Sequence, residues 1–243
     1  GVLRQERETA KHLPRGFDLQ VFRRIGSQGY VGRLASRHKG YLLLLILLDT
    51  SEKLEVCADE LQCEVGQLLT PLTRFNLQNK NGKFAIDNGA FSKFEAKGFM
   101  SLLDREKERR QNCIFVAVPD VVGSARRTLE VFQRWKGIIS AWPLALVAQD
   151  GQEDLEIPWD DITAIFLGGS TKFKVSDEAA QIVKAAKALD KWVHAGRVND
   201  PQRFKHFEEM GVDSCDGSGI SQYSHMRRAI ANRYAQLELA ESA

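Results

Sequence analysis

The stretch Phe84-Ala85-Ile86-Asp87-Asn88-Gly89-Ala90-Phe91-Ser92 joins a short apolar run to an acidic residue and a turn. A buried parallel strand has a short continuous apolar run as its sequence pattern, and in a βα barrel the functional groups lie where such strands end. Five further segments have the same form: Val118-Pro119-Asp120, Val147-Ala148-Gln149-Asp150, Phe166-Leu167-Gly168-Gly169-Ser170, His194-Ala195-Gly196-Arg197 and Asp213-Ser214-Cys215-Asp216-Gly217. This repetition predicts that several strand ends line one shared pocket.

Apolar runs alternate with helical patterns along the chain. Strands are expected at 41–48, 84–87, 113–118, 143–148, 164–167, 192–195 and 212–215. Ser124, Ser176 and Asp200 are expected helix N-caps, with Pro201 at the first helical position. Such alternation indicates a parallel sheet with helical crossovers. The section from Leu54 to Lys83 has no clear pattern.

Length supports the same fold class. The 243 residues are close to the roughly 250 of a typical βα barrel. We therefore expect an α/β fold, a (β/α)8 TIM-like barrel without a zinc subdomain, as a single domain over residues 1–243 with a polar N-terminal segment at 1–16.

Composition and cysteine spacing narrow the class of protein. The 43% hydrophobic and 27% charged fractions are ordinary for a soluble globular protein. A net charge of +2 neither proves nor excludes a nucleic-acid partner, because binding depends on a local basic patch. The four cysteines form no CxxC pair and no Cys/His cluster, so no metal site is expected. With no secretory signal and no apolar run of membrane-spanning length, the sequence favours a reducing cytoplasm, free thiols and no membrane partner.

The residue types at the strand ends indicate a chemistry. A pair of carboxylates, here among Asp87, Asp120 and Asp216, suits a reaction in which one group is the nucleophile and the other transfers protons. An Asp with a Gln such as Gln149 can read the edge of a flat heterocycle. Gly168 and Gly169 allow backbone N–H groups to approach a ligand oxygen. The set is consistent with chemistry at a glycosidic bond to a purine-like base.

The ordered motifs resemble those of the tRNA-guanine transglycosylases, and more closely their shorter relatives that place 7-deazaguanines in phage and bacterial DNA. The resemblance covers about Leu69 to Arg228 and rests on the series DNGAF, VPDVVG, LVAQDG, FLGGST, HAGRV and GVDSCDG. It departs from the tRNA enzymes in its shorter length and in lacking their cysteine-rich zinc element, which favours DNA over tRNA as the substrate.

The resemblance implies a role for each matching residue. Asp216 would be the nucleophile that attacks C1′, and Asp87 the carboxylate that handles protons. Asp120 and Gln149 would read the base edge, and the backbone of Gly168 and Gly169 would contact its carbonyl oxygen. The remaining expected substrate contacts are Ser170, His194, Gly196 and Arg197. No cofactor is implied; the expected partners are DNA, with tRNA as the alternative, a free base such as 7-cyano-7-deazaguanine, and a partner subunit that would open the duplex.

Basic residues provide candidate nucleic-acid contacts. Lys172 and Lys174 flank an aromatic residue as in single-strand binders, and Arg227 and Arg228 lie on an expected C-terminal helix. Each candidate also has an ordinary structural explanation. The Asp residues could form turns or a helix cap, His194 a core contact, and the basic residues a solvated face. Two other functions stay open: a barrel enzyme acting on a phosphorylated metabolite, and a non-catalytic binder of a nucleobase or nucleic acid.

Overall fold

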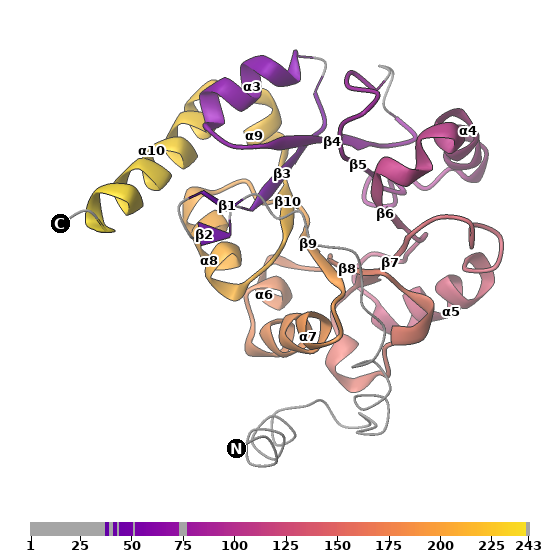
Figure 1. Ribbon diagram of the computed structural model, residues 1–243. Coiled ribbons are helices and arrows are strands. Elements are labelled where there is room, and N and C mark those ends of the chain that lie inside the picture. Colours follow the sequence, from indigo (N-terminus) through magenta and orange to yellow (C-terminus); the bar gives the residue numbers. More distant parts are fainter. Residues whose placement is uncertain (1–36, 39–40, 43, 51, 73–76, 242–243) are drawn as a thin grey trace, which may run out of the picture.

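The protein is a closed barrel of eight parallel strands (Figure 1). The computed structural model describes residues 37–38, 41–42, 44–50, 52–72 and 77–241. The barrel strands are β3 (Leu45–Leu48), β4 (Val65–Leu69), β5 (Phe84–Ile86), β6 (Cys113–Ala117), β7 (Leu144–Ala148), β8 (Ala164–Leu167), β9 (Trp192–Ala195) and β10 (Ser214–Asp216). They follow one another in sequence order around the barrel, and β10 pairs with β3 to close it. The expected TIM-like α/β barrel is confirmed.

Helices fill most of the connections between strands. These are α3 (Leu54–Leu61), α4 (Ala96–Glu106), α5 (Ala125–Trp135), α6 (Thr171–Lys174), α7 (Asp177–Ala188) and α8 (Pro201–Met210), while α9 (Ser218–Gln222) and α10 (Ser224–Glu241) follow the last strand. Short 3-10 turns are η2 (Lys107–Asn112), η3 (Gln152–Asp154) and η4 (Trp159–Asp161), and β1 (Arg37–His38) pairs with β2 (Tyr41–Leu42) outside the barrel. Between β7 and β8 the chain forms only η3 and η4, and the described residues between β4 and β5 contain no helix.

The three expected helix caps are present. Ser124 and Ser176 accept hydrogen bonds from backbone N–H groups at the starts of α5 and α7. Asp200 does the same for α8, where Pro201 is the first residue. These side chains satisfy N–H groups that have no partner within the helix.

Strand alternation divides the apolar residues into two layers. On β3, Leu45 and Leu47 belong to the cluster inside the barrel, whereas Ile46 and Leu48 belong to the cluster between strands and helices. Side chains of successive strand residues point to opposite faces, so one continuous apolar run can serve both layers. Phe115 and Phe166 are the large side chains of the inner cluster.

Three sequence-based boundaries need correction. The unclear section from Leu54 to Lys83 contains both α3 and a complete barrel strand, β4. The expected strand at 41–48 is divided into β2 and β3, with residue 43 outside the described residues, and the last strand covers 214–216 rather than 212–215. The expected N-terminal segment at 1–16 lies outside the described residues.

Candidate active site

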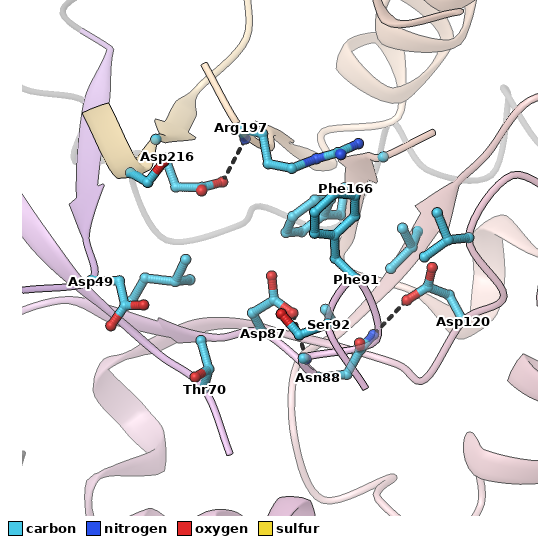
Figure 2. A pocket seen from close by; sticks show the side chains of 18 of the residues that line it. Asp49, Thr70, Asp87, Asn88, Phe91, Ser92, Asp120, Phe166, Arg197 and Asp216 are labelled. Atoms are coloured by element: carbon cyan, nitrogen blue, oxygen red, sulfur yellow. Dashed lines mark hydrogen bonds between the residues drawn. The ribbon is translucent and has the colours of Figure 1, made fainter. Parts of the chain in front are cut away.

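A cavity of about 540 Å³ opens where the barrel strands end (Figure 2). Residues at or just after the ends of all eight barrel strands contribute side chains or backbone to it. From the sequence-based candidates it contains Asp87, Asp120, Gln149, Gly168, Gly169, Lys174, Arg197 and Asp216. The fold therefore brings together groups that are up to 129 positions apart, from Asp87 to Asp216. Among the described residues, no helix is long and apolar enough to span a membrane.

Asp216 ends β10 and is held at one oxygen. Its Oδ1 accepts a hydrogen bond from the backbone N–H of Arg197 at 3.2 Å, drawn in Figure 2, and lies 3.0 Å from Nε2 of His194. No described residue donates a hydrogen bond to Oδ2. Gly217 follows directly, and a Cβ there would lie 2.2 Å from the carbonyl oxygen of Val198. Close packing of the β9 and β10 ends thus fixes this carboxylate.

Asp87 follows β5 and is perturbed by its surroundings. Burial raises its pKa from 3.8 to about 7, with smaller contributions from the carboxylates of Asp216, Asp120 and Asp49, and a hydrogen bond from the N–H of Gly89 opposes the shift. That hydrogen bond reaches Oδ1 at 2.7 Å. A carboxyl group with such a pKa exchanges protons readily near neutral pH.

Asp120 belongs to a polar group at the end of β6. Asn88 donates to its Oδ1 at 2.8 Å, and Nε2 of Gln149 donates to its Oδ2 at 2.6 Å. Burial raises the pKa of Asp120, and both of these hydrogen bonds oppose the shift. The N–H of Gly123 donates to Oε1 of Gln149 at 2.9 Å, which sets the orientation of the amide. Asp120 is thus a pocket carboxylate and not a helix cap, since Ser124 caps α5.

The Gly-Gly turn after β8 leaves no room for side chains. A Cβ on Gly168 would lie 2.7 Å from a methyl carbon of Val147, and Gly169 has a φ of +70°. The neighbouring Ser170 does not line the cavity; it caps α6 and its hydroxyl donates to Asp150 at 2.5 Å. Gly168 and Gly169 face the site, and Ser170 supports their loop.

Arg197 crosses the mouth of the cavity. Its guanidinium lies 4.1 Å from the ring centroid of Phe91 and donates to the carbonyl oxygen of Gly169. Arg197 itself has a left-handed backbone with a φ of 58°, which is uncommon for a residue with a side chain. Figure 2 shows the Arg197 side chain above the cavity that holds Asp87.

Other sequence-based candidates lie behind or beside the cavity. His194 is completely buried inside the barrel, and Gly196 contributes its carbonyl oxygen to a hydrogen bond from the buried Lys174. Burial lowers the pKa of Lys174 to about 8. Lys172 is exposed on α6 and outside the cavity lining.

Arg227 is buried, in contrast to an expected surface contact. It donates to Glu60 at 2.5 Å and Glu52 at 2.9 Å, and to two backbone carbonyl oxygens at the end of α9. Arg228, in contrast, is exposed, and its Nη1 lies 3.7 Å from Oε1 of Glu60. Arg227 therefore joins α10 to α3 and is not available as a nucleic-acid contact.

Several lining residues were not singled out from the sequence. Asp49 and Thr70 follow β3 and β4, and their positions at strand ends were the available signal. Phe91 and Asn88 lay within the quoted motif but were not assigned roles. Arg203 lies in the first turn of α8. No sequence pattern indicates that it lines the cavity, because its position depends on how that helix packs on the barrel.

Comparisons with known proteins do not identify a function for the chain. No family model matches the chain, and no curated protein matches it. Among the described residues, no group of three or more His, Cys, Asp or Glu side chains is arranged to hold a metal ion. All four cysteines, Cys57, Cys63, Cys113 and Cys215, are free.

Proposed function

We propose that the protein is a guanine transglycosylase that exchanges guanine in DNA for a 7-deazaguanine through a covalent Asp216–sugar intermediate. The observation that carries the proposal is the shared cavity: it contains a carboxyl group with a pKa near 7, a second carboxylate held by N–H donors, and a rigid carboxylate–amide pair. Each part has a separate task in base exchange.

In the first step an oxygen of Asp216 attacks C1′ of the target nucleotide. The bond between C1′ and N9 of guanine breaks, and its electron pair leaves with the base. Asp87, which is protonated below its pKa of about 7, donates a proton to the departing guanine. The product of this step is an ester between Asp216 and the sugar.

In the second step the incoming base replaces the enzyme. N9 of the deazaguanine gives its proton to Asp87 and attacks C1′, and the ester bond to Asp216 breaks. Two inversions give net retention at C1′. Asp87 is then protonated again, so the cycle is balanced without a cofactor.

Base recognition falls to the group around Asp120. Guanine and 7-deazaguanines present N–H donors at one edge, which suits the carboxylate of Asp120. Their carbonyl oxygen suits the second N–H of Gln149 and the backbone N–H of Gly169, since the N–H of Gly168 already donates to the carbonyl oxygen of Ala148 at 2.9 Å. Because Gln149 is oriented by Gly123, these donors and acceptors are fixed before a base enters.

A base inside a duplex cannot enter such a cavity, so the target nucleotide must be flipped out. Phe91, which is 65% exposed, provides an aromatic face, and Arg203 provides a cationic group in the lining of the same cavity. We favour DNA over tRNA because the motifs resemble the short DNA enzymes and lack the zinc element of the tRNA enzymes.

Guanine exchange tests this proposal directly. The protein is incubated with labelled guanine and duplex DNA, single-stranded DNA or bulk tRNA, beside Asp216→Asn and the control Asp154→Asn, which replaces an exposed carboxylate outside the cavity. We expect incorporation into DNA, its loss in Asp216→Asn, and wild-type incorporation in Asp154→Asn. Without a free base, wild type alone should form a protein–DNA adduct that survives denaturing electrophoresis.

Each other outcome has a defined meaning. Incorporation only into tRNA keeps the chemistry and overturns the choice of DNA. Binding of DNA that survives in Asp216→Asn, without exchange by wild type, favours the non-catalytic binder. Tight binding of inorganic phosphate without exchange favours the metabolite enzyme.

A further inference from the structure

Four side chains form a hydrogen-bonded row inside the barrel, from its interior to the cavity. Trp192 and His194 lie on β9, and Ser214 and Asp216 lie on β10, with Ser214 and His194 paired in register. Nε1 of Trp192 is 2.8 Å from Oγ of Ser214, which is 2.8 Å from Nδ1 of His194. Nε2 of His194 is 3.0 Å from Oδ1 of Asp216.

The chemistry of the two ends fixes the direction of this row. An indole N–H can only donate, so Ser214 must accept from Trp192. An ionised carboxylate can only accept, so Nε2 of His194 must carry a proton and donate to Asp216. The hydroxyl proton of Ser214 then has Nδ1 of His194 as its acceptor.

Burial makes the neutral form of His194 the consistent one. The ring is completely buried, with centroids of Phe166 and Phe115 at 4.6 and 5.0 Å. If Nδ1 were also protonated, both Trp192 and His194 would donate to Ser214, whose own buried hydroxyl proton would lose its acceptor. An unsatisfied buried donor and a buried charge are both costly.

We infer that Ser214 and His194 are positioning residues for the proposed nucleophile: the row from Trp192 holds His194 as the neutral Nε2–H tautomer and through it fixes Oδ1 of Asp216. Together with the N–H of Arg197, this gives Oδ1 two donors and leaves Oδ2 as the oxygen that attacks C1′. The inference rests on the proposed function for its catalytic meaning. The tautomer and the contact to Asp216 stand apart from it.

The first experiment measures the row itself and requires no turnover. Long-range proton–nitrogen correlation on protein with labelled histidine reports which ring nitrogen carries the proton, and His194→Gln identifies the signal by its loss. We expect an unprotonated Nδ1 and a protonated Nε2 at neutral pH. A doubly protonated ring, or a proton on Nδ1 alone, would overturn the inference.

A second measurement follows Asp216. Its carboxyl carbon resonance should move in His194→Leu, which removes the donor, and stay in place in His194→Gln, whose amide can donate from a similar position. Ser214→Ala serves if His194→Leu does not fold, because it leaves the imidazole but removes the hydroxyl that donates to Nδ1 and so sets its tautomer. An unchanged resonance in the folded donor-free variant would refute the contact.

Exchange kinetics connect the row to the proposed reaction. His194→Leu should lower kcat by about 10- to 100-fold with little change in KM for the free base, because a hydrogen bond to a charged group is lost away from the base site. His194→Gln should recover most of that loss, and His225→Gln, which changes an exposed histidine outside the cavity, should match wild type. Equal rates in His194→Leu and wild type would refute the positioning role. If wild type exchanges no base, the proposed function fails while the two spectra still decide the row.

Discussion

Asp87 shares its cavity with three other carboxylates and has a pKa of about 7, raised mainly by burial. The proposed first step needs its protonated form, so single-turnover release of guanine should fall as the pH rises through about 7. Asp87→Asn should slow that release by about 10²- to 10⁴-fold and remove this pH dependence. A wild-type rate that is constant between pH 5.5 and 9 would contradict the role.

The same residue predicts a change in stability with pH. Between pH 3.8 and about 7 the folded protein keeps a proton at Asp87 that the unfolded chain has released. The free energy of unfolding therefore decreases as the pH rises through this range. Asp87→Asn keeps an acceptor for the N–H of Gly89 and carries no charge. Its unfolding free energy relative to wild type should therefore be larger at pH 8 than at pH 4, by an amount on the order of a few kcal/mol.

Denaturant unfolding at the two pH values measures this difference, with Asp154→Asn as the exposed control. A difference between Asp87→Asn and wild type that does not change with pH would show that Asp87 has an ordinary pKa. The reaction plays no part in this measurement, so it tests the electrostatics of the cavity alone.

For single residues, position in the sequence predicted which side chains share the cavity, but not the hydrogen bonds and packing that fix them there. Asp87, Asp120 and Asp216 were found because strand ends converge in a barrel. The burial of Lys174 and Arg227 could not be predicted, because it depends on how α6 and α10 pack on the barrel. His194 was expected either in the core or at the substrate, and it lies in the core with one edge on Asp216.

The elements around Asp216 depend on one close backbone approach. A Cβ at Gly217 would lie 2.2 Å from the carbonyl oxygen of Val198 and 2.9 Å from Oδ1 of Asn199, so the loops after β9 and β10 would have to separate. Gly217→Ala should therefore lower the melting temperature and reduce exchange by more than tenfold, since Asp216 is adjacent. Gly137→Ala, where a Cβ meets nothing within 4 Å, is the matched control and should leave both unchanged.

Thermal unfolding and exchange assays of the two variants decide the point. A Gly217→Ala protein with wild-type stability and activity would mean that these loops adjust at no cost.

Elements with strong local signals were predictable, and those without them were not. α5, α7 and α8 have side-chain caps and apolar stripes, and the sequence located all three. β4 is Val65-Gly66-Gln67-Leu68-Leu69, in which a glycine and a buried glutamine interrupt the apolar run. Gly66 is required there because a Cβ would lie 2.9 Å from the carbonyl oxygen of Lys83, a contact that arises only when β4 pairs with β5.

For the whole molecule, closure of the barrel brings α10 against α3, the first helix among the described residues. In Figure 1, α10 lies beside α3, and the buried Arg227 connects them through Glu60 and Glu52. Arg227→Met would remove the guanidinium that donates to both carboxylates and to two backbone carbonyl oxygens, so the melting temperature should fall by about 5 °C or more. Arg228→Met, at a largely exposed side chain, should change it little. Equal melting temperatures for the two variants would refute the structural role of Arg227.

The position of the cavity at one end of the barrel also predicts which basic residue meets nucleic acid. Arg203 lines the cavity, and among the described residues its guanidinium makes no hydrogen bond or ion pair, whereas Lys205 on the same helix is exposed and 3.7 Å from Glu209. If DNA enters over this rim, Arg203→Gln should weaken binding of single-stranded DNA and reduce the slope of log K against log salt by about 0.7, the share of one phosphate contact. Lys205→Gln should keep the wild-type slope. An identical slope in Arg203→Gln and wild type would exclude a phosphate at Arg203, and the strand would then have to cross the rim elsewhere, past the exposed Lys172 on α6.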